Sequence, residues 1–172
     1  MKGKIKSITQ ISLCVAILSV ISQITIPIGA IPITLQTFII CVVGYTMGIK
    51  KGITATVTYI LVGLVGMPVF ASFNGGLGAI VGYTGGFIIG FIPLCAMCGI
   101  KKEHPTGIAL GILGALICHL MGITQYVLLS RTNFLLALVT VSLPYFVKDI
   151  FLVIMAYTVS RVIRKRLKNY IL

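Results

Sequence analysis

The sequence predicts an all-α integral membrane protein with six transmembrane helices, organised as a single membrane domain over residues 1–172. Hydrophobic residues make up 58% of the chain and charged residues only 9%, and the mean hydropathy is +1.14. An ordinary soluble domain carries about 25% charged residues, so this composition does not suit a water-exposed globular surface. Because a spanning helix needs roughly 20 apolar residues, the chain has room for about six or seven spans with short connections.

Prolines and charged residues divide the chain into successive apolar runs. The first run follows N-terminal lysines and ends at Pro27; it is longer than the core of a secretory signal, so we expect an uncleaved helix. Lys50 and Lys51 end the second run, Pro68 follows the third, and a basic segment ending at Pro105 follows the fourth. The predicted spans are residues 8–26, 34–48, 53–66, 79–100, 107–130 and 146–164, with outer loops at 27–33 and 67–78.

The start of the sixth span depends on Pro144. Residues 133–160 are apolar apart from a few polar positions and the charged pair Lys148 and Asp149. At 1.5 Å per residue, one helix of this length exceeds the hydrocarbon core of about 30 Å. Pro144 would disrupt a helix interior. We therefore expect residues 134–143 to lie at the membrane surface and the sixth span to begin near Phe146.

The distribution of charge predicts the orientation. All lysines and arginines except Arg131 and Lys148 fall on one side of the predicted spans, and both outer loops are uncharged. Under the positive-inside rule we expect a multi-pass cell-membrane protein with both termini in the cytoplasm. The net charge of +12 is then expected to face the headgroups of the lipid bilayer. We expect no nucleic-acid partner, because no basic patch is interleaved with exposed aromatic residues.

Catalytic and metal-binding patterns are missing from the sequence. It contains neither a Walker A motif for ATP hydrolysis nor the H-E-x-x-H of zinc proteases. The only acidic residues, Glu103 and Asp149, are far apart in the chain. Cys95 and Cys98 form a C-x-x-C without a second ligand pair, so we interpret the cysteines as small packing residues. We predict no enzyme activity, no cofactor and no metal site.

Three polar residues are predicted to share the outer third of the membrane: Gln36, Asn74 and Asp149. An ionisable residue at membrane depth is costly, which favours a functional role for Asp149, with Lys148 beside it. The alternative is a first-turn aspartate that only complements the helix dipole. Likewise, Asn74 could support a turn, and Gln36 could pair with another helix. Two amides and a carboxylate at one depth indicate a site for a small polar head group, open to the outside.

A series of short motifs between residues 31 and 149 follows the order of one known family. The motifs are I-P-I-T-L-Q-T at 31–37, G-M-P-V-F-A at 66–71, G-G at 75–76, G-Y-T-G-G-F at 82–87, and L-P-Y-F at 143–146 followed by Asp149. They resemble the P-I-T-L-Q-T, G-L-P-V-F-A, G-P-T-G-G-Y, L-P-F and G-D of the BioY family, the biotin-specific S components of energy-coupling factor (ECF) transporters. Each motif is weak alone, but the ordered set is specific.

The resemblance implies an S-component fold of six helices with a vitamin site near the outer surface. It implies that biotin is the ligand and that the site uses Asn74 and Asp149, with Thr34 and Gln36 close by. This chain departs from the family pattern in two places. Lys148 precedes the aspartate, and Leu152 stands where the family usually has a lysine. Tyr83 replaces a residue that is usually proline or arginine. Tyr83 and Lys148 are included among the predicted substrate contacts, Lys148 as the substitute cation.

The resemblance also implies partners. Small residues on the first helix, here Ser12 and Ala16, are expected to face the ECF transmembrane coupling subunit, which acts with ATPase subunits. The chain is thus expected to capture biotin outside and deliver it to the cytoplasm with these subunits. The alternatives are an S component for a different vitamin, a self-sufficient secondary transporter, which internal inverted repeats would favour, and a purely structural membrane subunit.

Overall fold

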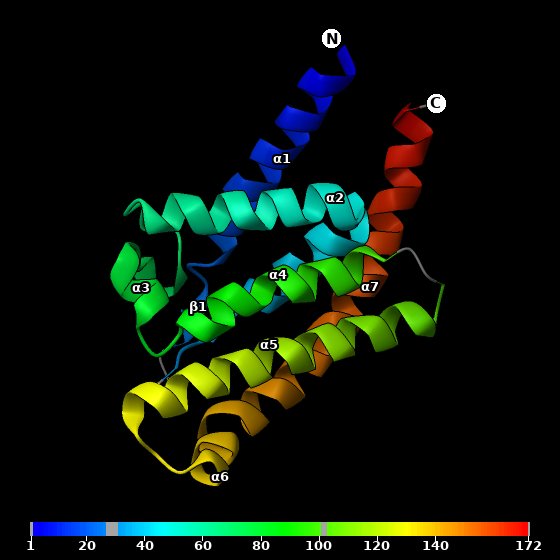
Figure 1. Ribbon diagram of the computed structural model, residues 1–172. Helices are drawn as coiled ribbons and strands as arrows, with labels where there is room; N and C mark the ends of the chain where they lie inside the picture. Colours follow the sequence, from blue (N-terminus) through cyan, green and yellow to red (C-terminus); the bar gives the residue numbers. More distant parts are fainter. Residues whose placement is uncertain (1, 27–30, 101–102, 172) are drawn as a thin grey trace.

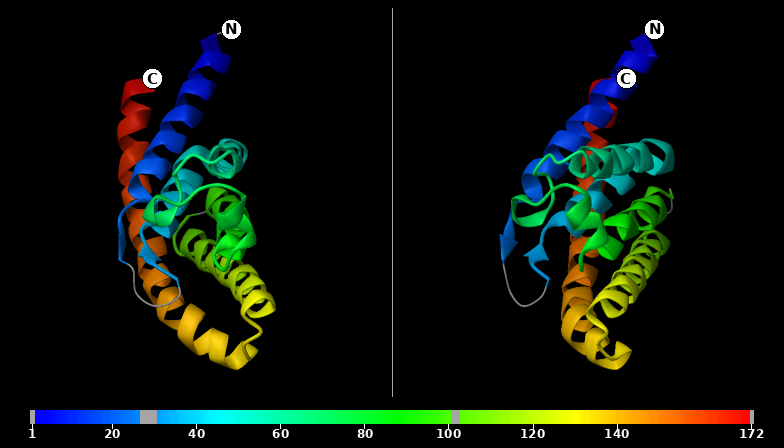
Figure 2. Two further views of the ribbon diagram at one scale, coloured as in Figure 1. Left: turned by 90° about the vertical axis from the view of Figure 1, so that its left-hand side faces the viewer. Right: turned by 60° about the vertical axis from the view of Figure 1, so that its left-hand side comes forward.

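The structure, a computed structural model, describes residues 2–26, 31–100 and 103–171 and is mostly helical (Figure 1). Figure 2 shows the start of α1 and the end of α7 on the same side of the molecule. The elements in chain order are α1 (Lys2–Ile21), β1 (Thr25–Ile26), β2 (Ile33–Thr34), α2 (Gln36–Leu64), the 3-10 turn η1 (Ala71–Phe73), α3 (Leu77–Val81), α4 (Gly85–Gly99), α5 (Thr106–Ser130), α6 (Phe134–Ala137), the π-helical turn η2 (Leu138–Ser142) and α7 (Leu143–Ile171).

The first helix ends earlier than predicted. α1 stops at Ile21, and the chain then forms β1, which pairs antiparallel with β2 through Thr25 opposite Thr34 and Ile26 opposite Ile33. The predicted first span to residue 26 is therefore too long, because its last residues are extended. Residues 27–30 of the predicted outer loop lie outside the described residues.

The second helix, α2, turns back on itself at a glycine. Gly48 has φ 75° and ψ 177°, a left-handed conformation that side chains other than glycine rarely adopt. The two halves of α2 contact each other on either side of this turn: a Cβ atom built on Gly52 would lie 3.4 Å from the Cα atom of Gly44. The predicted spans 34–48 and 53–66 correspond to these two halves.

The predicted span 79–100 is divided by a break at residues 82–84. α3 ends before Gly82, whose backbone is extended, and α4 begins at Gly85. Within α4, glycine permits a close approach to α5, because a Cβ atom on Gly90 would lie 2.8 Å from the Cα atom of Cys118. The predicted fifth span, 107–130, agrees with α5 to within one residue.

The helix break predicted at Pro144 is wrong. The chain stays helical from Phe134 through η2 into α7, and Figure 2 shows this continuous path bending near α6. Pro144 lies just after the π-helical turn η2, where the hydrogen-bond spacing changes and the missing N–H of proline is tolerated. The bend therefore accommodates Pro144 without ending the helix.

The predicted count of six spans is not confirmed. In the described part of the chain, four helices have the length and apolar character to cross a membrane: Gly3–Ile21, Gln36–Leu64, Thr106–Ser130 and Phe134–Arg166. The apolar helix Gly85–Gly99 is shorter. Large apolar side chains such as Val20, Leu128 and Phe151 are exposed, which is costly in water and favourable in lipid.

Candidate ligand-binding site

A cavity lies between the start of α2, the segment around η1, and helices α4, α5 and α7. About 740 Å³ is free of protein atoms there, a volume that includes the open solvent at the mouth of the cavity. Its apolar wall is formed mainly by Ile31, Phe70, Phe87, Ile88, Phe91 and Val141. Its polar lining includes Thr34, Gln36, Thr37, Asn74, His119, Tyr145, Lys148 and Asp149. Five of the six predicted substrate residues are among these.

Asp149 is the centre of the polar wall. Its carboxylate is buried, with the residue 6% exposed. Thr37 Oγ1 donates a hydrogen bond to Oδ2 at 3.1 Å, and His119 Nε2 lies 3.0 Å from the same oxygen. Oδ1 lies 2.8 Å from the Nζ atom of Lys148 but accepts no hydrogen bond within the described part of the chain. Because α7 begins at Leu143 as a continuation of η2, Asp149 is not in a first turn, and the helix-dipole interpretation does not fit.

Lys148 connects the aspartate to the segment before α2. Its Nζ donates a hydrogen bond to the backbone oxygen of Thr34 at 3.1 Å and forms the ion pair with Asp149. Three residues earlier on α7, the Tyr145 hydroxyl donates to the backbone oxygen of Ile31 at 2.5 Å. The segment containing Ile31 and Thr34 is therefore fixed across the cavity to α7. Lys148 and Asp149 are neighbouring opposite charges, so the pair adds no net charge to the cavity.

Three polar residues of the wall were not predicted as site residues: Thr37, Tyr145 and His119, of which only His119 lies outside the quoted motifs. His119 lies on α5, is 3% exposed, and bonds through Nδ1 to Ser142 Oγ at 2.9 Å as well as through Nε2 to Asp149. The rings of Phe87 and Phe146 meet its imidazole edge-to-face, with centroids 5.4 and 5.3 Å away. No motif surrounds His119 in the sequence; the one signal was a lone ionisable residue on an otherwise apolar span.

Gln36 and Asn74 differ in their exposure within the cavity wall. Gln36 is 5% exposed, and its Nε2 donates to the hydroxyl of Tyr59 at 2.8 Å. That hydroxyl donates in turn to the backbone oxygen of Val69 at 2.9 Å, which fixes the residues leading to η1. Asn74 is exposed, and its backbone pairs with Phe70. Its side-chain amide forms no hydrogen bond within the residues described.

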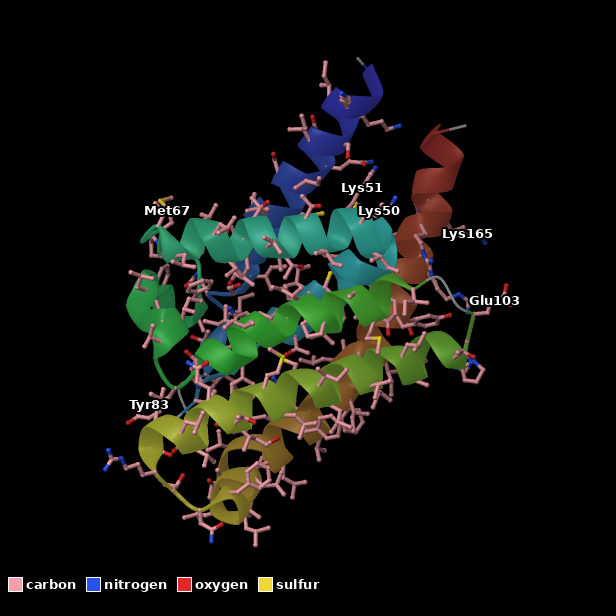
Figure 3. All side chains as sticks on the ribbon, viewed as in Figure 1. Lys50, Lys51, Met67, Tyr83, Glu103 and Lys165 are labelled. Carbon is pink, nitrogen blue, oxygen red and sulfur yellow. The ribbon has the colours of Figure 1, made fainter. Side chains whose placement is uncertain are left out.

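Three other predicted residues lie away from the cavity wall. Tyr83 is 50% exposed, and its ring contacts that of Tyr126 at 5.4 Å, so its predicted role as a substrate contact has no support in this geometry. Figure 3 shows it at the same end of the molecule as Met67. Ser12 and Ala16 lie on the exposed face of α1, whereas Cys14 and Leu18 of the same helix are buried.

Comparisons with known proteins identify relatives of this chain and a solved structure with its fold. The probable biotin transporter BioY of Pyrococcus horikoshii is 35% identical over 148 residues, covering 86% of this chain and 89% of that protein. The biotin transporter BioY of Thermotoga maritima is 38% identical over 112 residues, covering 63% of this chain and 66% of the relative. The crystal structure of the S-component for biotin from an ECF-type ABC transporter has the same fold, with a TM-score of 0.88, 23% sequence identity, and coverage of 95% of this chain and 93% of that one.

The family match extends over nearly all of the sequence. The model of the BioY family matches residues 1–169, which include every element that forms the cavity. The motif resemblance, the relatives and the solved structure therefore converge, and the chain belongs to the BioY family of membrane transport proteins.

Proposed function

We propose that this chain is the substrate-binding S component of an ECF-type vitamin uptake transporter and that its ligand is biotin. The observation that carries the proposal is Asp149: a buried carboxylate in the cavity wall whose Oδ1 accepts no hydrogen bond from the described residues. Lys148 pairs with this oxygen, but buried carboxylate oxygens also accept hydrogen bonds, and an N–H donor of a ligand would supply one. The family membership and the relatives named biotin transporters support the choice of ligand.

The chemistry of biotin matches the polarity of the cavity. Its ureido ring has two N–H donors and one carbonyl acceptor, so it needs an acceptor such as Asp149 Oδ1 and a donor such as the Asn74 amide. The bicyclic ring and the alkyl part of the valerate tail suit the apolar wall around Phe70, Phe87 and Phe91. Lys148 has ammonium hydrogens beyond the one given to Thr34, and these suit the valerate carboxylate.

The proposed orientation places both termini in the cytoplasm. In Figure 3, Met67 and Tyr83 lie at one end of the molecule, whereas Lys50, Lys51 and Lys165 lie toward the opposite end, with the start of α1 and the end of α7. This separation supports the orientation that follows from the positive-inside rule. Counting the two halves of α2 separately, the chain would cross the membrane six times, through α1, α2 twice, α4, α5 and α7.

The proposed partners are a transmembrane coupling subunit and ATPase subunits. The sequence has no Walker A motif of its own, so an ATP-driven uptake cycle would require other chains. Ser12 and Ala16 support α1 as the contact helix, because small exposed residues one helical turn apart let a second helix approach closely.

Calorimetry of the purified chain in detergent tests the ligand. Biotin, thiamine and riboflavin are titrated separately, with biotin amide as a fourth ligand that lacks the carboxylate charge. We expect saturable binding of biotin at one site per chain and none of thiamine or riboflavin. Binding of another vitamin in place of biotin would retain the S-component role but refute the ligand, and absence of binding by all four would refute the site.

A further inference from the structure

His119 binds the Oδ2 oxygen of the Asp149 carboxylate. A carboxylate only accepts hydrogen bonds, so the Nε2 atom of His119, 3.0 Å from Oδ2, must carry the hydrogen. In a neutral imidazole Nδ1 is then an acceptor, and the Ser142 hydroxyl, 2.9 Å away, donates to it. Both ring nitrogens are thus used within the protein, which leaves neither of them for a ligand.

The position of His119 is fixed independently of Asp149. Ser142 is the last residue of η2, the π-helical turn before α7, and is itself 3% exposed. The rings of Phe87 and Phe146 approach the imidazole edge-to-face from α4 and α7. Three elements therefore hold the ring that in turn binds Oδ2, and the histidine can act as a rigid support.

We propose that His119 is a positioning residue for ligand binding: it fixes the rotation of the Asp149 carboxylate so that Oδ1 stays available to an N–H donor of the ligand. The inference rests on the function proposed above. An aspartate side chain has two rotatable bonds, and bonds from His119 and Thr37 to one oxygen determine where the other oxygen lies. A carboxylate oriented before binding loses less conformational freedom when the ligand arrives, which strengthens binding.

Two substitutions of His119 separate positioning from packing. In His119→Gln the amide nitrogen can take the place of Nε2, so the donor to Asp149 is kept and the bond to Ser142 is lost. In His119→Asn the amide reaches the place of Nδ1, so the bond to Ser142 is kept and the donor to Asp149 is lost. Both variants lose the edge-to-face ring contacts. We expect biotin to bind His119→Gln within about threefold of the wild type and His119→Asn about tenfold more weakly.

Thermal unfolding and a double-mutant cycle complete the test. Because both variants lose the same ring contacts, their unliganded melting temperatures should fall by similar amounts while their affinities differ. In an Asp149→Asn background the further change His119→Asn should weaken binding by less than about twofold, because the carboxylate that it positions is gone. Ser142→Ala, which keeps His119 itself, should weaken binding by about threefold and serves if His119→Asn does not fold.

The outcomes are distinct. Equal weakening by His119→Gln and His119→Asn, or full additivity with Asp149→Asn, would assign His119 to packing and overturn the inference. So would unchanged biotin affinity in Ser142→Ala, should His119→Asn not fold. Failure of the wild-type chain to bind biotin would instead refute the proposed function, and the inference with it.

Discussion

The substitution Asp149→Asn removes the charge at the centre of the cavity while keeping the size of the side chain. In the structure Oδ2 receives hydrogen bonds from Thr37 and His119, whereas Oδ1 lies beside Lys148. In the variant, the amide oxygen would stay with the two donors, Thr37 and His119. The NH2 group would then take the position of Oδ1, where it would face the Lys148 ammonium and the N–H of a bound ureido ring. The amide N–H would then face two other hydrogen-bond donors and no acceptor.

The expected loss of affinity follows from this conflict. A hydrogen bond to a charged group contributes roughly 1.5–3 kcal/mol net, and each 1.4 kcal/mol is about tenfold in affinity. Asp149→Asn should therefore weaken biotin binding by about tenfold to a hundredfold. Lys148 would lose its counter-ion but keep its bond to Thr34, and its side chain is 25% exposed, so the folded state should survive the change.

Calorimetry with biotin is the direct assay, and Glu103→Gln is the matched control. Glu103 is the other acidic residue of the chain and lies exposed before α5, outside the cavity wall, so its neutralisation should leave the dissociation constant unchanged. Melting temperatures of the unliganded variants separate a loss of binding from a loss of folding. Asp149→Asn binding biotin as tightly as the wild type would refute the role of the carboxylate.

Three further predictions address the cation, the partner surface and the orientation. If Lys148 contacts the valerate carboxylate, Lys148→Ala should weaken biotin binding more than biotin-amide binding in calorimetry; equal losses would mean that it only pairs with Asp149. Ala16→Trp should reduce co-purification of the coupling and ATPase subunits by several fold while biotin affinity is kept, and unchanged assembly would exclude this face of α1 as the contact. Since the five native cysteines are buried, a membrane-impermeant thiol reagent should label Met67→Cys in intact cells but Lys165→Cys only after lysis, and the reverse pattern would invert the topology.

Much of the cavity could be predicted because membrane depth follows from sequence. Gln36, Asn74 and Asp149 were placed in the outer third of the bilayer from the span boundaries alone, and all three line the same cavity. Depth does not give the direction in which a side chain points around a helix. Tyr83 shares this end of the molecule with Met67 but faces Tyr126 instead of the cavity. It lies in the break between α3 and α4, which the predicted continuous span 79–100 does not contain.

His119 could not be predicted, because its role depends on contacts between residues far apart in the chain. Its partners Ser142 and Asp149 are 23 and 30 residues away in the chain, on elements whose packing the sequence pattern did not reveal. The helix boundaries show a related limit. A glycine can be a packing residue within a helix, as Gly90 is, or a reversal of the chain, as Gly48 is, and the amino-acid sequence does not distinguish the two roles.

The contact between Lys148 and Asp149 shows how a departure from the family pattern can be accommodated. Adjacent residues on a helix point about 100° apart and do not ordinarily face each other. Here the long lysine side chain extends to Thr34, and this bond keeps its ammonium at the cavity, 2.8 Å from Asp149 Oδ1. The ammonium thereby offsets the cost of burying the carboxylate before any ligand is present. Because the pair is neutral, binding of an anion would depend on hydrogen bonds from the ammonium more than on net charge. Comparing the dissociation constants of biotin and its uncharged amide separates these two contributions.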